Sequence, residues 1–167
     1  MILGFNEICK EDVIKVGGKG ANLGEMLSAG INVPKGFVIT ADAYKEFLRI
    51  NSLNELLKDE LTKAGRDHAK LLKAAEKFRE LIKMGRLPEN TVNEVKSAYQ
   101  NLGENILVAV RSSATAEDLS DASFAGQQES YLNIRGIDDV LDKIRDCYAS
   151  LWGNRAVIYR ANQNYNQ

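Results

Sequence analysis

The sequence is poor in the residues that most metal and redox sites require. It contains one histidine, His68, and two cysteines, Cys9 and Cys147, among 167 residues. A paired-histidine mechanism or a metal site with several histidine ligands is therefore excluded within this chain. Because no CxxC pair occurs, a zinc ribbon and a thioredoxin-type redox site are excluded as well.

An excess of one charge and a long apolar run are also absent. The 22 basic and 23 acidic residues nearly cancel, so no strong field would attract nucleic acid or an anionic membrane. No stretch approaches the roughly 18 apolar residues of a membrane-spanning helix, and residues 1–10 lack the pattern of a secretory signal. We therefore expect a cytoplasmic protein with reduced thiols and with neither nucleic acid nor membrane as a partner.

What is present is ordinary globular composition with mixed periodicity, which predicts a helix-rich α+β fold. Apolar residues at helical spacing predict helices near residues 21–29, after Thr40, three times over 52–102, after Gly136 to about Ser150, and from about Asn154. Strands are predicted near 37–40, 106–111 and 129–134, with a short one near 2–5. We expect the first three of these strands to form one small mixed sheet surrounded by the helices.

The strand near 129–134 is predicted from alternation. Tyr131 and Asn133 would lie on one face of it, and Leu132 and Ile134 on the other.

A glycine-rich turn is the first candidate site. Residues 16–24 read VGGKGANLG, which places Lys19 in a turn that opens a helix. Free backbone N–H groups and the dipole at a helix N-terminus favour an anion, and the lysine favours phosphate. The spacing matches neither a Walker A loop nor the dinucleotide-binding fingerprint. A flexible turn with a solvated lysine is the alternative.

Two further candidate sites lie at and just after the end of the strand near 106–111. Arg111 directly follows its apolar run, where the guanidinium can bind a phosphate or carboxylate with two hydrogen bonds, or form a salt bridge. The loop over 112–128 is longer than an ordinary connection, and Gly126 would let a ligand approach its backbone. The acidic residues upstream of Gly126 would bind a metal or simply solvate the loop, and the pattern alone is typical of an ordinary surface loop.

Four segments together resemble the phosphoenolpyruvate synthase and pyruvate phosphate dikinase family. They are Val16–Met26 with Val33–Phe37, Val110–Leu119, Ser123–Gln128 and Leu151–Ala156. The resemblance extends over the whole chain and is weakest over 52–102. Rifampin phosphotransferase shares this nucleotide-binding module.

The resemblance implies the first lobe of an ATP-grasp-like domain that binds ATP. It implies phosphate contacts, with catalytic importance, from Lys19 and Arg111. The family's phosphate loop falls on Ala125, Gly126 and Gln127, and Ser130 stands where the family usually has threonine.

The resemblance also implies partners that this sequence does not include. A second lobe with the adenine pocket and the magnesium ligands, and a domain with a phosphorylated histidine, would follow Gln167. We therefore expect residues 1–167 to be one truncated N-terminal lobe, with a helical insertion at about 52–103 and no metal ligand of its own. It would bind phosphate or nucleotide without turnover.

The parent enzyme would convert ATP, pyruvate and water to phosphoenolpyruvate, AMP and phosphate through the phosphohistidine. Two alternatives remain open: a stand-alone non-catalytic binding or regulatory module, and the antibiotic-phosphorylating branch represented by rifampin phosphotransferase.

Overall fold

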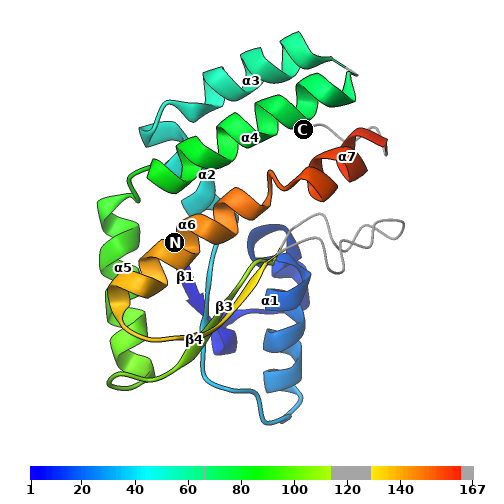
Figure 1. The fold of residues 1–167 in the computed structure, drawn as a ribbon. Helices are drawn as coiled ribbons and strands as arrows, with labels where there is room; N and C mark the ends of the chain where they lie inside the picture. The colour runs from blue at the N-terminus through cyan, green and yellow to red at the C-terminus, as the bar shows by residue number, and fades with distance from the viewer. Residues whose placement is uncertain (66, 114–128, 163–167) are drawn as a thin grey trace.

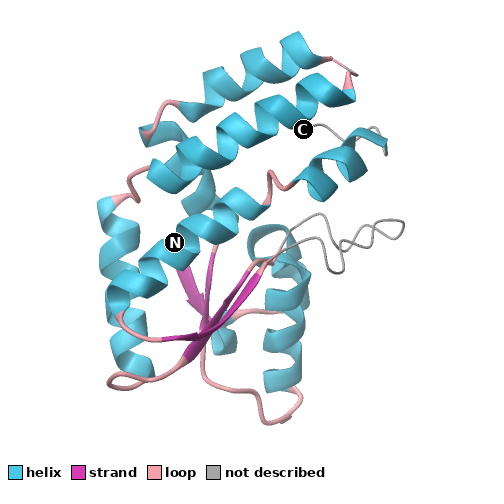
Figure 2. Cartoon of the chain, in the orientation of Figure 1, coloured by secondary structure: helices cyan, strands magenta, loops and turns pink. Residues whose placement is uncertain are grey.

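The computed structural model describes residues 1–65, 67–113 and 129–162 (Figure 1). Its helices are α1 (Val13–Ser28), α2 (Ala41–Ile50), α3 (Leu53–Ala64), α4 (His68–Met84), α5 (Glu89–Leu102), α6 (Ile137–Ser150) and α7 (Asn154–Asn162). Its strands are β1 (Ile2–Gly4), β2 (Phe37–Ile39), β3 (Val108–Arg111) and β4 (Ser130–Ile134), and two short 3-10 helices precede α1. The helix-rich α+β class predicted from the sequence is confirmed, as Figure 2 shows.

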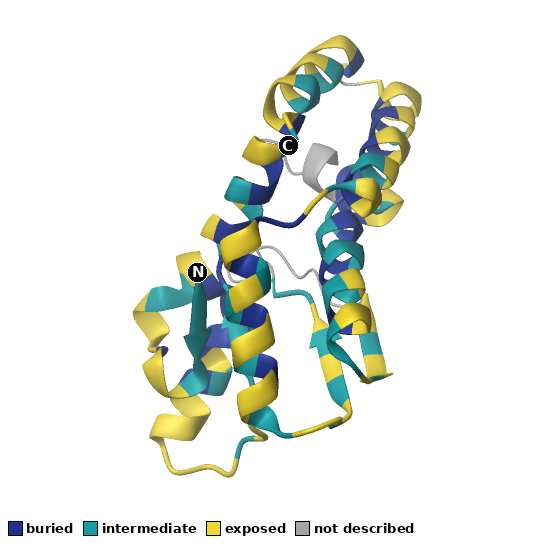
Figure 3. Ribbon diagram, turned by 90° about the vertical axis from the view of Figure 1, so that its left-hand side faces the viewer, coloured by how far each residue is buried: buried dark blue, intermediate teal, exposed yellow. Residues whose placement is uncertain are grey.

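The main core lies where α4 packs against α6 and α7. Its fully buried side chains include Phe47 from α2, Phe78 and Ile82 from α4, Val95 from α5 and Val157 from α7. Phe78 and Ile82 are four residues apart, so they lie one turn apart on the same face of α4. Figure 3 shows buried and exposed residues on different sides of the helices. The three helices predicted over 52–102 are therefore confirmed together with their apolar faces.

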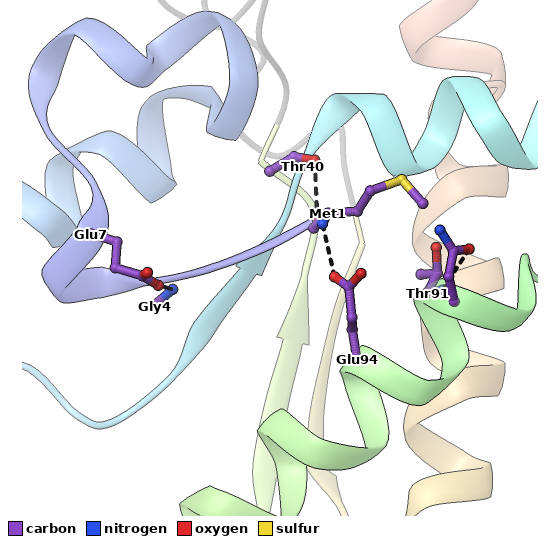
Figure 4. Close-up of polar contacts among 7 residues, drawn as sticks. Met1, Gly4, Glu7, Thr40, Thr91 and Glu94 are labelled. Atoms are coloured by element: carbon purple, nitrogen blue, oxygen red, sulfur yellow. Dashed lines mark hydrogen bonds and ion pairs between the residues drawn. The ribbon is translucent and has the colours of Figure 1, made fainter.

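The four strands form two separate antiparallel pairs. β1 pairs with β2, and β3 pairs with β4. The predicted pairing of 106–111 with 129–134 is confirmed, but the single mixed sheet is wrong, because Phe37–Ile39 pairs with Ile2–Gly4 instead. The backbone N–H and the side-chain hydroxyl of Thr40 both donate to the Met1 carbonyl, at 3.0 and 3.2 Å, and extend this pairing (Figure 4).

The β1–β2 pair separates two apolar cores. Ile2, Phe37 and Ile39 pack against the main core, whereas Leu3 and Val38 pack against a smaller one around Val16 and Ala21 of α1. Neighbouring residues of a strand point to opposite faces, so each face of this short sheet contacts a different core. The sheet therefore holds α1 against the rest of the domain.

The strand β4 contains a bulge that the sequence did not reveal. Val108 pairs with Ile134 and Val110 with Tyr131, so β4 advances three residues while β3 advances two. Asn133 has a φ of 58°, in the left-handed region. The predicted alternation is wrong at this point: Leu132 and Asn133 are both exposed, while Tyr131 and Ile134 are both partly buried.

The side chain of Thr91, in the first turn of α5, offers a test of the core (Figure 4). It is fully buried, and its hydroxyl has no hydrogen-bond partner within the described ranges. Thr91→Val removes this hydroxyl, so we expect the free energy of unfolding to stay constant or rise by about 1 kcal/mol. Thr91→Ser keeps the hydroxyl and removes a methyl group, and should lower it by about 1 kcal/mol. Urea unfolding followed by circular dichroism ranks the variants, and a Val variant less stable than the Ser variant would contradict this account.

Candidate functional site

Helix α1 consists of two helical segments joined at Gly17. This residue has φ 69° and ψ 168°, a conformation that favours glycine. The helix begins at Val13, earlier than expected, and the interruption indicated by the glycine-rich sequence falls at Gly17. The residues after the break, Gly18 to Gly20, therefore carry the N-terminal backbone amides of the second segment.

Ser113, which follows β3, packs directly on this break. A Cβ atom added to Gly17 would lie 2.4 Å from both the carbonyl oxygen and the hydroxyl oxygen of Ser113. The backbone N–H of Gly20 donates to the same hydroxyl at 3.2 Å. Ser113 thus supplies the cap that a serine at the Gly17 position would ordinarily provide.

This contact brings two of the predicted site residues into one region. Lys19 precedes Gly20 and is half-buried, and Arg111 lies two residues before Ser113 and is exposed. The segments are 93 residues apart in sequence, so their meeting is a product of the fold. Sequence reasoning assigned no role to Ser113, because a serine after a strand has no distinguishing pattern.

The contact also changes the interpretation of the glycines. We expected the free N–H groups of the turn to bind an anion, but the Gly20 N–H is bonded to Ser113. The need for glycine at position 17 follows from its backbone conformation and from the close approach of Ser113. Any phosphate bound here would therefore depend on side chains more than on the Gly20 amide.

Arg111 and Ser130 lie across from each other at one end of the β3–β4 pair. Arg111 is the last residue of β3 and Ser130 is the first residue of β4, and both are exposed. Val108 and Val110 are partly buried against the main core, so Arg111 belongs to the opposite face of the strand. The other predicted site residues, Ala125, Gly126 and Gln127, lie outside the described residues.

Asp12 lies directly before α1 and links two neighbouring residues. Its carboxylate accepts hydrogen bonds from the backbone N–H and the thiol of Cys9, both at 3.2 Å, and from the Lys15 ammonium at 3.1 Å. The bond from the Cys9 backbone, followed by the thiol and Lys15, lowers the pKa of Asp12 to about 2. Asp12 is therefore ionised at neutral pH, where it pairs with Lys15 in the first turn of the helix that carries Lys19.

The described part of the chain shows neither a metal-binding cluster nor a membrane-spanning helix. No three His, Cys, Asp or Glu side chains in residues 1–65, 67–113 and 129–162 lie close enough together to hold one metal ion. None of the described helices combines the length and the apolarity needed to cross a membrane.

Comparison with known proteins identifies the class of this domain. Residues 13–167 match the family model "Pyruvate phosphate dikinase, AMP/ATP-binding domain". The chain therefore belongs to this family, and the resemblance drawn from the four sequence segments is confirmed.

The similar curated proteins are phosphoenolpyruvate synthases. The chain is 44% identical to the one from Pyrococcus furiosus, over 96% of this chain and 24% of the relative. It is 44% identical to the one from Aquifex aeolicus, over 96% and 20%, and 42% identical to the one from Pseudomonas aeruginosa, over 98% and 22%. The chain thus spans about a quarter of these relatives or less.

The crowding at Gly17 can be tested against a matched glycine. Gly17 and Gly30 both have positive φ, at 69° and 77°, but no atom lies within 4 Å of a Cβ added at Gly30. Gly30→Ala should therefore cost only a conformational penalty of about 1 kcal/mol. Gly17→Ala should cost at least about 2 kcal/mol more, because it displaces Ser113 and because φ 69° with ψ 168° is open essentially only to glycine. Chemical unfolding of both variants measures the difference, and equal losses would show that Ser113 does not crowd Gly17.

Proposed function

We propose that this chain binds the phosphates of ATP between the break in α1 and the end of the β3–β4 pair at which Arg111 lies opposite Ser130. The observation that carries this proposal is the contact of Ser113 with Gly17 and Gly20, which brings the segments of Lys19 and Arg111 together. Membership of an AMP/ATP-binding domain family supports it.

The residues of this region fit a polyphosphate. The guanidinium of Arg111 can bind two oxygens of one phosphate, and the Lys19 ammonium supplies a second positive charge. The Ser130 hydroxyl, opposite Arg111, can donate to a phosphate oxygen. We assign Ala125, Gly126 and Gln127 to the phosphate loop on the family resemblance, and we expect magnesium to accompany ATP.

These roles suit phosphoryl transfer, in which an enzyme mainly positions the phosphates and neutralises their charge. We propose that the whole protein converts ATP, pyruvate and water to phosphoenolpyruvate, AMP and phosphate through a phosphohistidine on another domain. A second lobe and that domain would be the partners of this chain. The names of the relatives support this activity. Rifampin phosphotransferase and a stand-alone binding module are the alternatives to it.

An ATP titration of the 167-residue chain, followed by two-dimensional ¹H–¹⁵N NMR, tests the binding site. We expect the amides of Lys19, Arg111, Ser113 and Ser130 to shift. Arg111→Ala and Lys19→Ala should each weaken ATP binding about tenfold, because each removes a charged hydrogen-bond donor.

Two controls match these variants in residue type. Arg135→Ala removes an exposed arginine just beyond the other end of β4, and Lys73→Ala removes an exposed lysine on α4. Both should bind ATP as the unmodified chain does. Equal affinities for the Arg111→Ala and Arg135→Ala variants would refute the proposed phosphate site.

The isolated chain should bind nucleotide without completing the reaction. Its one histidine, His68, is an exposed residue at the start of α4, outside the phosphohistidine motif of the family. We expect no acid-labile phosphate on the chain, and no labelled phosphoenolpyruvate, after incubation with magnesium, pyruvate and ATP labelled at its β- and γ-phosphates. The Lys19→Ala variant sets the background, and label above that background would show that the chain is catalytically self-sufficient.

A further inference from the structure

The hydroxyl of Tyr99 connects β3 and β4 at the end opposite Arg111. Tyr99 lies in α5 and is only 6% exposed. Its hydroxyl donates to the carbonyl of Ile106 at 2.9 Å and accepts from the backbone N–H of Gly136 at 3.0 Å. These two contacts, which we call the Tyr99 bridge, hold the residues just before β3 and just after β4.

The Tyr99 bridge lies at a defined place in the strand ladder. Val108 pairs with Ile134, and Ile106 and Gly136 are each two residues farther out. In an antiparallel pair, these positions face each other. The Tyr99 hydroxyl stands between them and bonds to the Ile106 carbonyl and to the Gly136 N–H. One side-chain oxygen therefore links the chain just before β3 to the chain just after β4.

The register of the two strands determines what lies at the other end. Continued without the bulge, the pairing of Val108 with Ile134 would place Ser112 opposite Ser130. With the bulge at Leu132 and Asn133, Arg111 is opposite Ser130 instead. A shift by one residue moves each side chain of a strand to the other face, so a slip of β3 against β4 would separate Arg111 from Ser130.

We propose that Tyr99 is a positioning residue for the phosphate site. Its bridge and the bulge together keep Arg111 and Ser130 across from each other, while the core around Val95 holds α5 in place. Tyr99 touches no reacting group and acts through the two strands. This inference rests on the proposed function, since it concerns the same phosphate site.

The substitution Tyr99→Phe tests the Tyr99 bridge because it removes the hydroxyl and keeps the ring. Amide hydrogen exchange should become at least about tenfold faster in β3 and β4, because two hydrogen bonds that anchor them are lost. The ATP affinity of the 167-residue chain should fall about three- to tenfold in the NMR titration.

The control for a purely structural effect is Ile82→Ala on α4, away from α5 and the two strands. Ile82 is fully buried, so this variant should lose more overall stability than Tyr99→Phe. Measured well below its melting temperature, it should keep the ATP affinity of the unmodified chain.

A second pair of variants tests the register without changing Tyr99. Asn133→Val disfavours the left-handed conformation of the bulge residue and should weaken ATP binding. Asn133→Gly allows that conformation and should leave ATP binding unchanged.

The outcomes separate the two claims. If the unmodified chain binds ATP and Arg111→Ala weakens binding, but Tyr99→Phe binds ATP normally, the inference is overturned and the proposed function stands. Faster exchange with unchanged affinity also overturns the inference, because Tyr99 would then be structural only. If the unmodified chain does not bind ATP, the proposed function fails and the positioning role fails with it.

Discussion

The contact of Ser113 with the break in α1 is the constraint on which the candidate site depends. The α1 helix belongs to the smaller core around Val16 and Ala21, whereas β3 packs against the main core. Gly17 lets the backbone of Ser113 approach, and Gly20 donates to its hydroxyl. These contacts, together with the β1–β2 sheet, connect the two cores, and Lys19 and Arg111 are carried on the segments that meet there.

Glycine-rich turns before helices have two physical explanations that sequence alone does not separate. A missing side chain admits either a ligand or another part of the protein, and both produce the same residues. At Gly17, the close neighbour is Ser113. Lys19 therefore stays a proposed phosphate contact on the strength of its positive charge and of the family resemblance.

The features predicted correctly from the sequence are those that local periodicity determines, namely the helices and their apolar faces. The apolar stripe of α4, with Phe78 and Ile82 among its members, and the helices around it followed from spacing alone. The pairing of Phe37–Ile39 with Ile2–Gly4 did not, because three-residue strands are too short to show a period and their partner is chosen by tertiary contacts. The bulge in β4 was missed for a similar reason: Asn133 breaks the alternation only through its backbone conformation.

The residues of the candidate site also fall into two groups, those that the sequence predicted and those that only the structure revealed. Lys19, Arg111 and Ser130 were predicted from their residue types and from the family resemblance, and they stay predictions. Ser113 and Tyr99 were not predicted, since a serine after a strand and a tyrosine on an apolar helix face are common in any domain. Their importance comes from backbone groups more than 30 residues away, namely Gly20 for Ser113 and Gly136 for Tyr99.

The helices over 52–102 contain none of the four segments on which the family resemblance was based, yet they are integral to the fold. Phe78 and Val95 from these helices are fully buried in the main core, and Tyr99 of α5 bonds to the backbone on both sides of the β3–β4 pair. This role needs only the buried face of α5 and one hydroxyl that bonds to the backbone beside both strands. Under our proposal, α5 helps to set the register at the phosphate site, and the core and that site are coupled through the two strands they share.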